Sequence, residues 1–380
     1  MKSWNTVHLT TLDLTAYCFL RPWFRRLRSE GHRVTLITTV EKFGPELEAV
    51  TDELINISIP RRIEPGADAR ALLALTARLR ALRPDFVHTH TSKAGLLGRL
   101  ATRLSGRPTR LLHTIHELPQ NSARSAVMKN FYWLAEKMAA LLADHLVTVS
   151  EVNAKQILQE RICAPGKLTV VPNGIDLANY TIKSEPSALR AAWDIPADAY
   201  ILGTSARLET AKGHTYLLEA LPELLKRIPN LYWVCTSGTG ALREPLQEQA
   251  RRLGVTHRVR WLGWVEDLPS AMAAFDLFVL PTLYEGQGVV LLEAMAMKKA
   301  IVCSRVGGTQ DVLLDGQTGL FVPPRDPRAL VEAIVALHSH PERARRFGEA
   351  GRARVEEHFQ ARASDDKMME VYRSLGPVAK

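Results

Sequence analysis

The sequence predicts an α/β protein made of two doubly wound domains. Apolar, strand-like runs alternate with amphipathic, helix-like segments along the whole chain, which is typical of parallel βαβ units. The length of 380 residues exceeds what one hydrophobic core usually holds, so two domains are expected. The alternation is interrupted once, by a polar stretch with helix breakers that ends near Pro186 and predicts the domain junction.

The elements follow in order along both halves. In the first half, the expected strands are residues 6–10, 34–40, 86–88, 110–115 and 145–149, and the expected helices are 19–29, 69–82, 96–104 and 122–143. In the second half, strands are expected at 200–205, 231–236, 259–262, 277–280, 300–303 and 319–322, with helices between them. Residues 341–375 are predicted to be mostly helical. We therefore expect two Rossmann-like domains that face a central cleft.

Composition limits the class of protein. The sequence is 46% hydrophobic and 23% charged, as in ordinary globular proteins. It has no run of 18 uncharged apolar residues, so no transmembrane helix is expected, and it begins in a strand-like run without a secretory leader. Four scattered cysteines without metal-ligand spacing indicate a reducing compartment. We expect a cytoplasmic protein.

The net charge of +9 is concentrated in the first half. Residues 1–186 contain 25 Lys/Arg and 17 Asp/Glu, and the remainder contains 24 and 23. Such a domain fits an anionic membrane or acceptor, but a soluble basic domain without such a partner is slightly favoured by charge alone. Two aromatic stripes with basic flanks, near Trp23 and near Trp133, fit either a membrane surface or, more commonly, the core face of a helix.

Two acids mark a candidate ligand site in the second half. Glu285 follows the apolar strand 277–280 and opens the segment Gly286-Gln287-Gly288, and Glu293 lies on the helix behind it. The carboxyl end of a buried strand and a helix N-terminus are places where α/β sheets bind phosphate-containing ligands. The neighbours of Glu293 are apolar, so an exposed surface acid is the less favoured alternative. Glu293 is expected to bind a ribose diol, and Glu285 sugar hydroxyls.

Two cations follow the first strand of the same domain. Arg207 and Lys212 leave strand 200–205 on a short loop, where guanidinium and ammonium groups bind phosphate oxygens. Solvated surface cations are the alternative.

Histidines end two strands of the first half. His116 follows strand 110–115 and is a candidate for a sugar or phosphate contact, although a structural histidine is the better interpretation of that motif alone. His88 and His90 alternate, but no acidic or cysteine partner has ligand spacing, so we predict no metal there. The chain also has no Asp-x-Asp, the usual carboxylate pair for a nucleotide-bound metal.

Together these segments resemble the family 4 glycosyltransferases, which have the two-domain GT-B fold. Glu285 to Glu293 resembles the family's Glu-x7-Glu motif, and Arg207 with Lys212-Gly213 its phosphate-binding cations. The runs that carry the remaining resemblance are Val306-Gly307-Gly308, Asp315-Gly316, Thr318-Gly319-Leu320, Val171-Pro172-Asn173-Gly174-Ile175-Asp176, Lys93-Ala94-Gly95 and Thr114-Ile115-His116. The resemblance implies an N-terminal acceptor-side domain 1–180, a nucleotide-sugar domain 187–355, and a helix 356–380 that returns to the first domain.

The resemblance also implies a retaining, metal-independent transferase acting on a UDP- or GDP-linked sugar. Arg207 and Lys212 would hold the diphosphate, Glu293 the ribose, Glu285 the sugar, and His116 a sugar hydroxyl or phosphate, with the amides of residues 286–288 facing the donor. The acceptor would be a glycan or lipid-linked glycan of surface polysaccharide, lipopolysaccharide or glycolipid, at the inner face of the membrane. No cofactor and no nucleic-acid partner are expected.

Two alternatives remain open on the residues alone. One is a GT-B-fold nucleotide-sugar 2-epimerase, which needs no acceptor. The other is a basic module that binds nucleic acid or anionic lipid, for which Glu285 and Glu293 would have no role. The chain also departs from the family pattern: residues 10–15 lack the glycine pair of many relatives, and Glu117 stands where glycine usually follows the histidine.

Overall fold

The computed structural model describes residues 3–123 and 125–378. The chain forms two compact units, one of Met1–Asn173 with Ala361–Lys380 and one of Gly174–Gln360. The junction lies before the predicted 180–187 boundary because the intervening residues are bonded to the second unit: Ile175 pairs with Gln360, and the Tyr180 hydroxyl donates to Glu293. The second unit likewise extends beyond residue 355, to Gln360.

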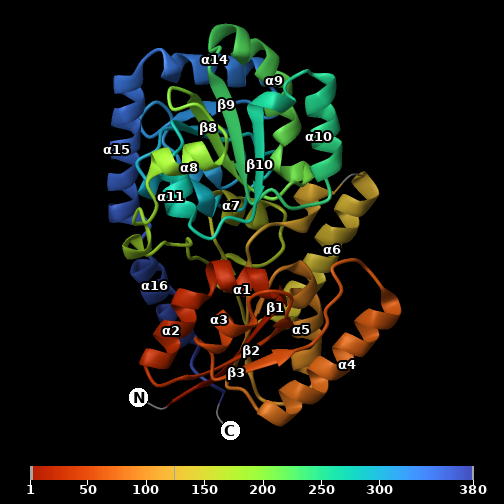
Figure 1. Ribbon diagram of the computed structural model, residues 1–380. Helices are drawn as coiled ribbons and strands as arrows, with labels where there is room; N and C mark the ends of the chain where they lie inside the picture. Colours follow the sequence, from red (N-terminus) through yellow and green to blue (C-terminus); the bar gives the residue numbers. More distant parts are fainter. Residues whose placement is uncertain (1–2, 124, 379–380) are drawn as a thin grey trace. The chain divides into compact units, whose positions relative to one another are not determined.

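The first unit is built on a seven-stranded parallel sheet of order β3-β2-β1-β4-β5-β6-β7 (Figure 1). Its strands are β1 (Asn5–Leu12), β2 (Arg33–Thr39), β3 (Glu53–Asn56), β4 (Phe86–His90), β5 (Arg110–Ile115), β6 (His145–Thr148) and β7 (Leu168–Val170). Its α-helices are α1 (Asp13–Phe19), α2 (Arg21–Ser29), α3 (Gly44–Glu48), α4 (Pro65–Leu82), α5 (Ser92–Leu104), α6 (Ala126–Leu142), α7 (Glu151–Gln159) and α16 (Ala361–Leu375).

Three differences from the expected elements have physical causes. The helix predicted at 19–29 is α2, which begins at Arg21 with Pro22 in its first turn. A separate helix that was not predicted, α1, precedes it and ends at Phe19, so that the two meet at Leu20. The edge strands β3 and β7 were missed because they are short and no residue of either is fully buried, so their apolar signal is weak. Helix α6 begins at Ala126, since residues 119–122 form a separate 3₁₀ turn.

The two faces of this sheet bury different residues. Val7 and Leu9 of β1 point into an apolar core with α4 and α5. His8, between them, lies beside Phe24 of α2, with ring centroids 4.8 Å apart. Because side chains alternate along a strand, His88 and His90 of β4 share the face of Phe86, which contacts Tyr372 of α16. Helix α16 also contacts α2, so the last helix of the chain belongs to the first unit.

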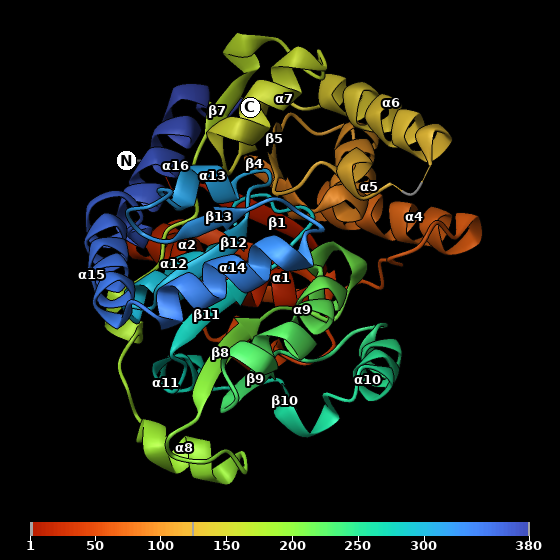
Figure 2. The same ribbon diagram turned by 90° about the horizontal axis from the view of Figure 1, so that it is seen from above.

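The second unit holds a six-stranded parallel sheet of order β10-β9-β8-β11-β12-β13 (Figure 2). Its strands are β8 (Tyr200–Ser205), β9 (Leu231–Thr236), β10 (Val259–Gly263), β11 (Leu277–Leu280), β12 (Ile301–Ser304) and β13 (Leu320–Val322). Its α-helices are α8 (Pro186–Ala192), α9 (His214–Arg227), α10 (Arg243–Arg252), α11 (Leu268–Ala273), α12 (Val289–Ala296), α13 (Thr309–Val312), α14 (Pro327–His338) and α15 (Pro341–His358).

The strand order of the second unit places its switch point between β8 and β11. From β8 the chain first adds β9 and β10 on one side and then returns to add β11, β12 and β13 on the other. Ligands of open α/β sheets bind at such a reversal, beyond the carboxyl ends of the strands. All donor-site residues predicted in the second half lie in the loops, or on the helix, that follow β8 and β11.

Candidate functional site

Lys212 and Glu285 meet at this switch point. Lys212 ends the 3₁₀ turn after β8 (Thr210–Lys212), and Glu285 lies in the loop between β11 and α12. Lys212 Nζ lies 2.6 Å from Glu285 Oε1, and the two side chains are only 15% and 8% exposed. Two residues 73 positions apart in the sequence therefore form a close and largely buried ion pair.

Arg207 lies in the same loop as Lys212 but is more exposed. Its Nη1 is 2.9 Å from Glu209 Oε1, and 44% of its side chain is open to solvent. The structure thus gives the two predicted phosphate-binding cations different surroundings. Lys212 is fixed against Glu285, whereas Arg207 pairs with an acid of its own loop.

Backbone contacts hold the loops after β8 and β11 together. Leu283 N donates to Ala211 O at 2.7 Å, and Thr282 Oγ1 donates to the same carbonyl at 2.8 Å. Gly213 has φ +66°, and a Cβ there would lie 1.9 Å from Pro281 O. Glycine is therefore required beside Lys212, both for the backbone conformation and for the approach of the two loops.

Glycines in the loops after β9 and β12 also support this site. Gly308 N donates to Glu285 O at 3.1 Å, and a Cβ on Gly307 would lie 2.2 Å from that oxygen. A Cβ on Gly240 would lie 2.5 Å from Leu208 O, beside Arg207. The loops after β9 and β12 thus pack against the loops that carry Arg207 and Glu285.

The segment Gly286-Gln287-Gly288 leads directly into α12. All three residues are buried, and Gln287 is 3% exposed. Gly288 is the N-cap of α12 in a left-handed conformation, with φ 81°. Gly213 has the same role at the start of α9, so two helices of the unit begin in the loops that hold Lys212 and Glu285.

Glu293 is a half-buried acid on α12. Burial raises the pKa of Glu293 to about 7, and the hydrogen bond from Tyr180 at 3.1 Å partly opposes that rise. Near neutral pH this carboxyl therefore exchanges readily between its protonated and ionised forms. Tyr180 was not predicted as a site residue, because it lies in the junction 113 residues away and carries no local motif.

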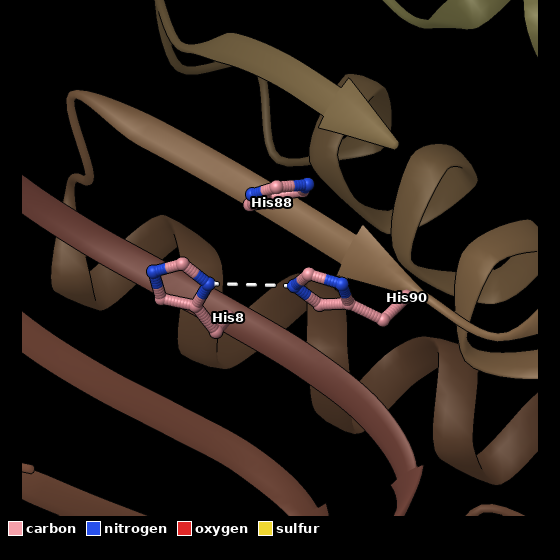
Figure 3. Close-up of side chains that lie close together, drawn as sticks. All are labelled: His8, His88 and His90. Atoms are coloured by element: carbon pink, nitrogen blue, oxygen red, sulfur yellow. Dashed lines mark hydrogen bonds between the residues drawn. The ribbon is translucent and has the colours of Figure 1, made fainter. Parts of the chain in front are cut away.

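His116 lies in the first unit, directly after β5. It is half-buried, and its Nε2 is 3.4 Å from His90 Nδ1. His90 Nε2 is in turn 3.5 Å from His8 Nδ1 (Figure 3). Burial lowers the pKa of His116 to about 4 and that of His8 to about 3, so both rings are neutral at pH 7. The three imidazoles form a line that leads from the interior to His116.

His88 adjoins this line without being bonded to it. Its Nδ1 contacts the Tyr372 hydroxyl at 3.0 Å, and its Nε2 contacts Thr114 Oγ1 at 2.7 Å. His8, His88 and His90 are close enough to hold a metal ion, but His88 would then lose one of these bonds. Ligand spacing along the chain was an insufficient test, since the register of β1 against β4 brings His8 beside His88.

The Lys93-Ala94-Gly95 segment serves packing inside the first unit. Lys93 Nζ is 2.7 Å from Asp68 Oδ2 of α4, and Arg99 forms a buried ion pair of 2.8 Å with Glu136 of α6. A Cβ on Gly95 would lie 2.4 Å from the ring of His113, which itself bonds Thr89 Oγ1 at 2.9 Å. These residues fix α5 between the sheet and its neighbouring helices.

Comparison with known proteins identifies the family. Residues 187–354 match the model described as glycosyl transferases group 1, and residues 23–179 match the model of glycosyltransferase family 4. An alpha-maltose-1-phosphate synthase of Mycolicibacterium smegmatis is 30% identical over 334 residues, which are 82% of this chain and 85% of that protein. The chain belongs to the family 4 glycosyltransferases.

Relatives of this glycosyltransferase include enzymes of lipid-linked and capsular glycans. An Escherichia coli UDP-Gal:alpha-D-GlcNAc-diphosphoundecaprenol alpha-1,3-galactosyltransferase is 28% identical, with 83% of this chain and 82% of that protein aligned. The capsular polysaccharide biosynthesis glycosyltransferase CapM of Staphylococcus aureus is 24% identical, with 99% and 98% aligned.

Solved structures show the same fold. The Anabaena protein HepE in complex with UDP and glucose has a TM-score of 0.84 at 21% identity, covering 98% of this glycosyltransferase and all of that chain. A sucrose-phosphate synthase of Thermosynechococcus elongatus has a TM-score of 0.84 at 23% identity, covering 98% and 99%. The predicted GT-B fold is confirmed, with two parallel-sheet Rossmann-like domains.

Proposed function

We propose that this glycosyltransferase transfers a sugar, with retention of anomeric configuration, from a UDP- or GDP-linked donor to a glycan or lipid-linked acceptor of a cell-surface polysaccharide or glycolipid. The observation that carries the proposal is the contact between Lys212 and Glu285 at the switch point of the second unit. It joins a cation suited to phosphate with an acid suited to sugar hydroxyls, beside the N-termini of α9 and α12.

Lys212 and Arg207 are the proposed ligands of the donor diphosphate. The Lys212 ammonium carries three N–H donors, so contact with Glu285 is compatible with a phosphate contact. Arg207 presents a planar guanidinium that binds two oxygens at once, and its exposed position lets it exchange Glu209 for phosphate. The amides of residues 286–288 and the N-terminal ends of α9 and α12 add partial positive charge.

Glu293 and Glu285 are the proposed ligands of the two sugars of the donor. An ionised Glu293 accepts hydrogen bonds from both hydroxyls of the ribose, as acids do in dinucleotide-binding folds. Those donors replace part of the lost hydration and so favour the ionised form. Glu285 is held in place by Lys212 and by the backbone of Gly308, which suits a residue that must orient the transferred sugar.

The proposed chemistry is a front-face substitution. The acceptor hydroxyl attacks the anomeric carbon from the side of the departing diphosphate, whose oxygen takes the hydroxyl proton as the glycosidic bond forms. Lys212 and Arg207 offset the negative charge that develops on that oxygen. His116 is assigned to a sugar hydroxyl or phosphate by its family resemblance, and it would act there as a neutral ring.

We further propose that the reaction needs no metal or other cofactor. The two cations placed on the diphosphate provide the charge that a divalent ion supplies in other nucleotide-sugar enzymes. The sequence also has no Asp-x-Asp to hold such an ion on the donor.

The proposed location is the cytoplasm, at the inner face of the membrane where lipid-linked acceptors are built. In the part of the chain that the structure describes, no helix is both long and apolar enough to cross a membrane. The acceptor of the E. coli relative is a sugar linked to diphosphoundecaprenol. Attachment to the membrane would therefore depend on a surface of the protein.

A donor and acceptor screen tests the proposal. UDP- and GDP-linked hexoses and N-acetylhexosamines are offered with an undecaprenyl-diphosphate-linked sugar, with and without EDTA, and nucleoside diphosphate release and product linkage are measured. We expect release with one donor, an unchanged rate in EDTA, and an α-linked product from an α-linked donor. An inverted linkage, or interconversion of donors without diphosphate release, would contradict the proposal. The variant Lys212→Ala, measured in the same assay, tests the proposed diphosphate ligand. Its control is Lys226→Ala, which alters an exposed lysine near the C-terminal end of α9.

A further inference from the structure

Helix α6 presents an apolar stripe to solvent. Among the described residues, ten large hydrophobic side chains are exposed, and five of them lie on this one helix. They are Val127, Phe131, Leu134, Met138 and Leu141, with exposures between 51% and 78%. Their spacing of three and four residues places all five on one face of the helix. An apolar face of this extent is unusual for a helix that needs no partner.

The opposite face of α6 is firmly packed, so the stripe points outward from a well-seated helix. Glu136 on that face forms the buried ion pair with Arg99 of α5, and Ala139 and Ala140 are buried. Trp133 Nε1 donates to Glu160 O at 3.0 Å. Rotation of α6 to bury the stripe would break these contacts. The core interpretation of the stripe of Phe131, Tyr132 and Trp133 is therefore wrong for Phe131, whereas Tyr132 and Trp133 are half-buried.

The other aromatic stripe, near Trp23 on α2, is buried instead of exposed. Trp23, Phe24 and Leu27 are 5% exposed or less, and they pack inside the first unit. The interpretation as a core face is correct for these three residues, whereas Phe19, which the predicted stripe also included, is 38% exposed. Sequence alone gave both stripes the same description, and burial separates them.

The charge around α6 selects an anionic partner. Residues 61–142, which span α4, α5 and α6, contain 14 Lys/Arg and 5 Asp/Glu, so this segment accounts for the whole net charge of +9. The remaining residues are balanced, with 35 of each sign. Helices α4, α5 and α6 lie side by side (Figures 1 and 2), and Arg70, Arg78 and Arg80 of α4 are exposed.

The solvent-accessible charged residues of α6 are likewise all positive. Lys129 and Lys137 are solvent-accessible, and the acid of this helix, Glu136, is buried against Arg99. A second copy of α6 packed against the stripe would bring like charges together without a compensating acid. An anionic bilayer accommodates both features, because it buries the apolar side chains at the acyl boundary and pairs the lysines with headgroups.

We propose that the outer face of α6 lies in the headgroup region of an anionic phospholipid bilayer and attaches the first unit to it. The inference rests on the proposed function in one respect, since a lipid-linked acceptor makes this attachment useful. Val127, Phe131, Leu134, Met138 and Leu141 enter the boundary between headgroups and acyl chains. The basic residues of α4 and α6 provide attraction that depends on salt concentration.

Co-sedimentation with vesicles tests this surface. The full-length protein is mixed with vesicles of phosphatidylcholine alone or with added phosphatidylglycerol, at low and at high salt. The double variant Phe131→Gln/Leu134→Gln removes two stripe residues that are each 51% exposed. Ile182→Gln, which alters a 54% exposed apolar residue of the second unit, is the control. Thermal unfolding of each variant shows whether the fold is retained.

The wild type and Ile182→Gln should bind phosphatidylglycerol vesicles, with weaker binding at high salt. The double variant should bind at least about tenfold more weakly while its unfolding temperature is unchanged, because each lost side chain forfeits apolar burial in the bilayer. Absence of wild-type binding, equal binding by the double variant, or a dimer in sedimentation that the double variant abolishes would each overturn the proposal. Wild-type turnover with a water-soluble acceptor is measured separately, so that failure of the vesicle test and failure of the proposed function are distinguishable.

Discussion

Replacement of Lys212 by alanine should reduce both turnover and stability. Lys212 Nζ lies 2.6 Å from the Oε1 atom of Glu285, whose side chain is 8% exposed. Removal of the ammonium leaves a largely buried carboxylate without this cation, which costs about 3 kcal/mol in comparable pairs. For a domain of this size, that loss lowers the unfolding temperature by about 6–12 °C. Loss of the charge that we propose stabilises the leaving diphosphate should lower kcat by about 10²–10³-fold.

The two losses can be separated by a second change. In Lys212→Ala/Glu285→Gln, a neutral amide replaces the buried carboxylate, so much of the stability should return while turnover stays low. Lys226→Ala, which alters a lysine 74% exposed on α9, should match the wild type in both measurements. Unfolding temperature is followed by differential scanning fluorimetry, and turnover by nucleoside diphosphate release.

Three results would refute this reasoning in different ways. Near-normal turnover in Lys212→Ala would remove Lys212 from the proposed diphosphate site. An unfolding temperature equal to that of Lys226→Ala would mean that the ion pair contributes no measurable stability. Recovery of turnover in the double variant would show that the ammonium acts only by neutralising Glu285.

Three further predictions concern protonation and backbone geometry. Burial raises the pKa of Glu293 to about 7, so the KM for the donor should fall as pH rises through 7. Tyr180→Phe should move that change to higher pH, because it removes a hydrogen bond that lowers the pKa of Glu293. Donor titrations across pH measure both effects. Burial lowers the pKa of His8 from 6.5 to about 3, so the folded protein binds fewer protons than the unfolded protein, and stability should be lost as pH falls from 6.5 toward 3. His8→Leu should lessen that loss in acid denaturation curves. An unchanged slope in the variant would contradict this prediction. Gly213→Ala should lower the free energy of unfolding by more than about 1 kcal/mol and should reduce turnover. Gly254→Ala is the control, because Gly254 has φ +71° with open space around it, and this variant should lower the free energy of unfolding by only about 1 kcal/mol. Chemical denaturation measures both values.

Much of the fold could be predicted from the sequence because buried parallel strands give strong local signals. The six strands of the second unit were each expected at or near their observed positions, since they are short apolar runs between helical patterns. The edge strands β3 and β7 of the first unit give no such signal, because they are short and bury no residue, whereas the edge strands β10 and β13 of the second unit each bury a valine. The domain boundary was misplaced because the polar stretch before Pro186 resembles a linker but is bonded to the second unit through Tyr180 and Ser184.

The candidate site depends on information that spacing along the chain does not contain. Loops that follow neighbouring parallel strands lie at the same edge of the sheet, so a place near β8 and β11 could be expected for Arg207, Lys212 and Glu285. The ion pair itself depends on the left-handed conformation at Gly213 and on the approach of Pro281. Strand register, which pairs His8 with His88, is equally invisible to motif spacing.

The shared backbone contacts among the loops of the second unit constrain how this enzyme can be re-engineered. The backbone of Gly213 packs closely against Pro281, that of Gly307 against Glu285, and that of Gly240 against Leu208. Four segments from different parts of the chain therefore have mutually dependent conformations. A graft of a single segment from a relative with another donor would leave mismatched surfaces against the other three. A change of donor sugar should therefore succeed more often when the segments after β8, β9, β11 and β12 are transplanted as a set.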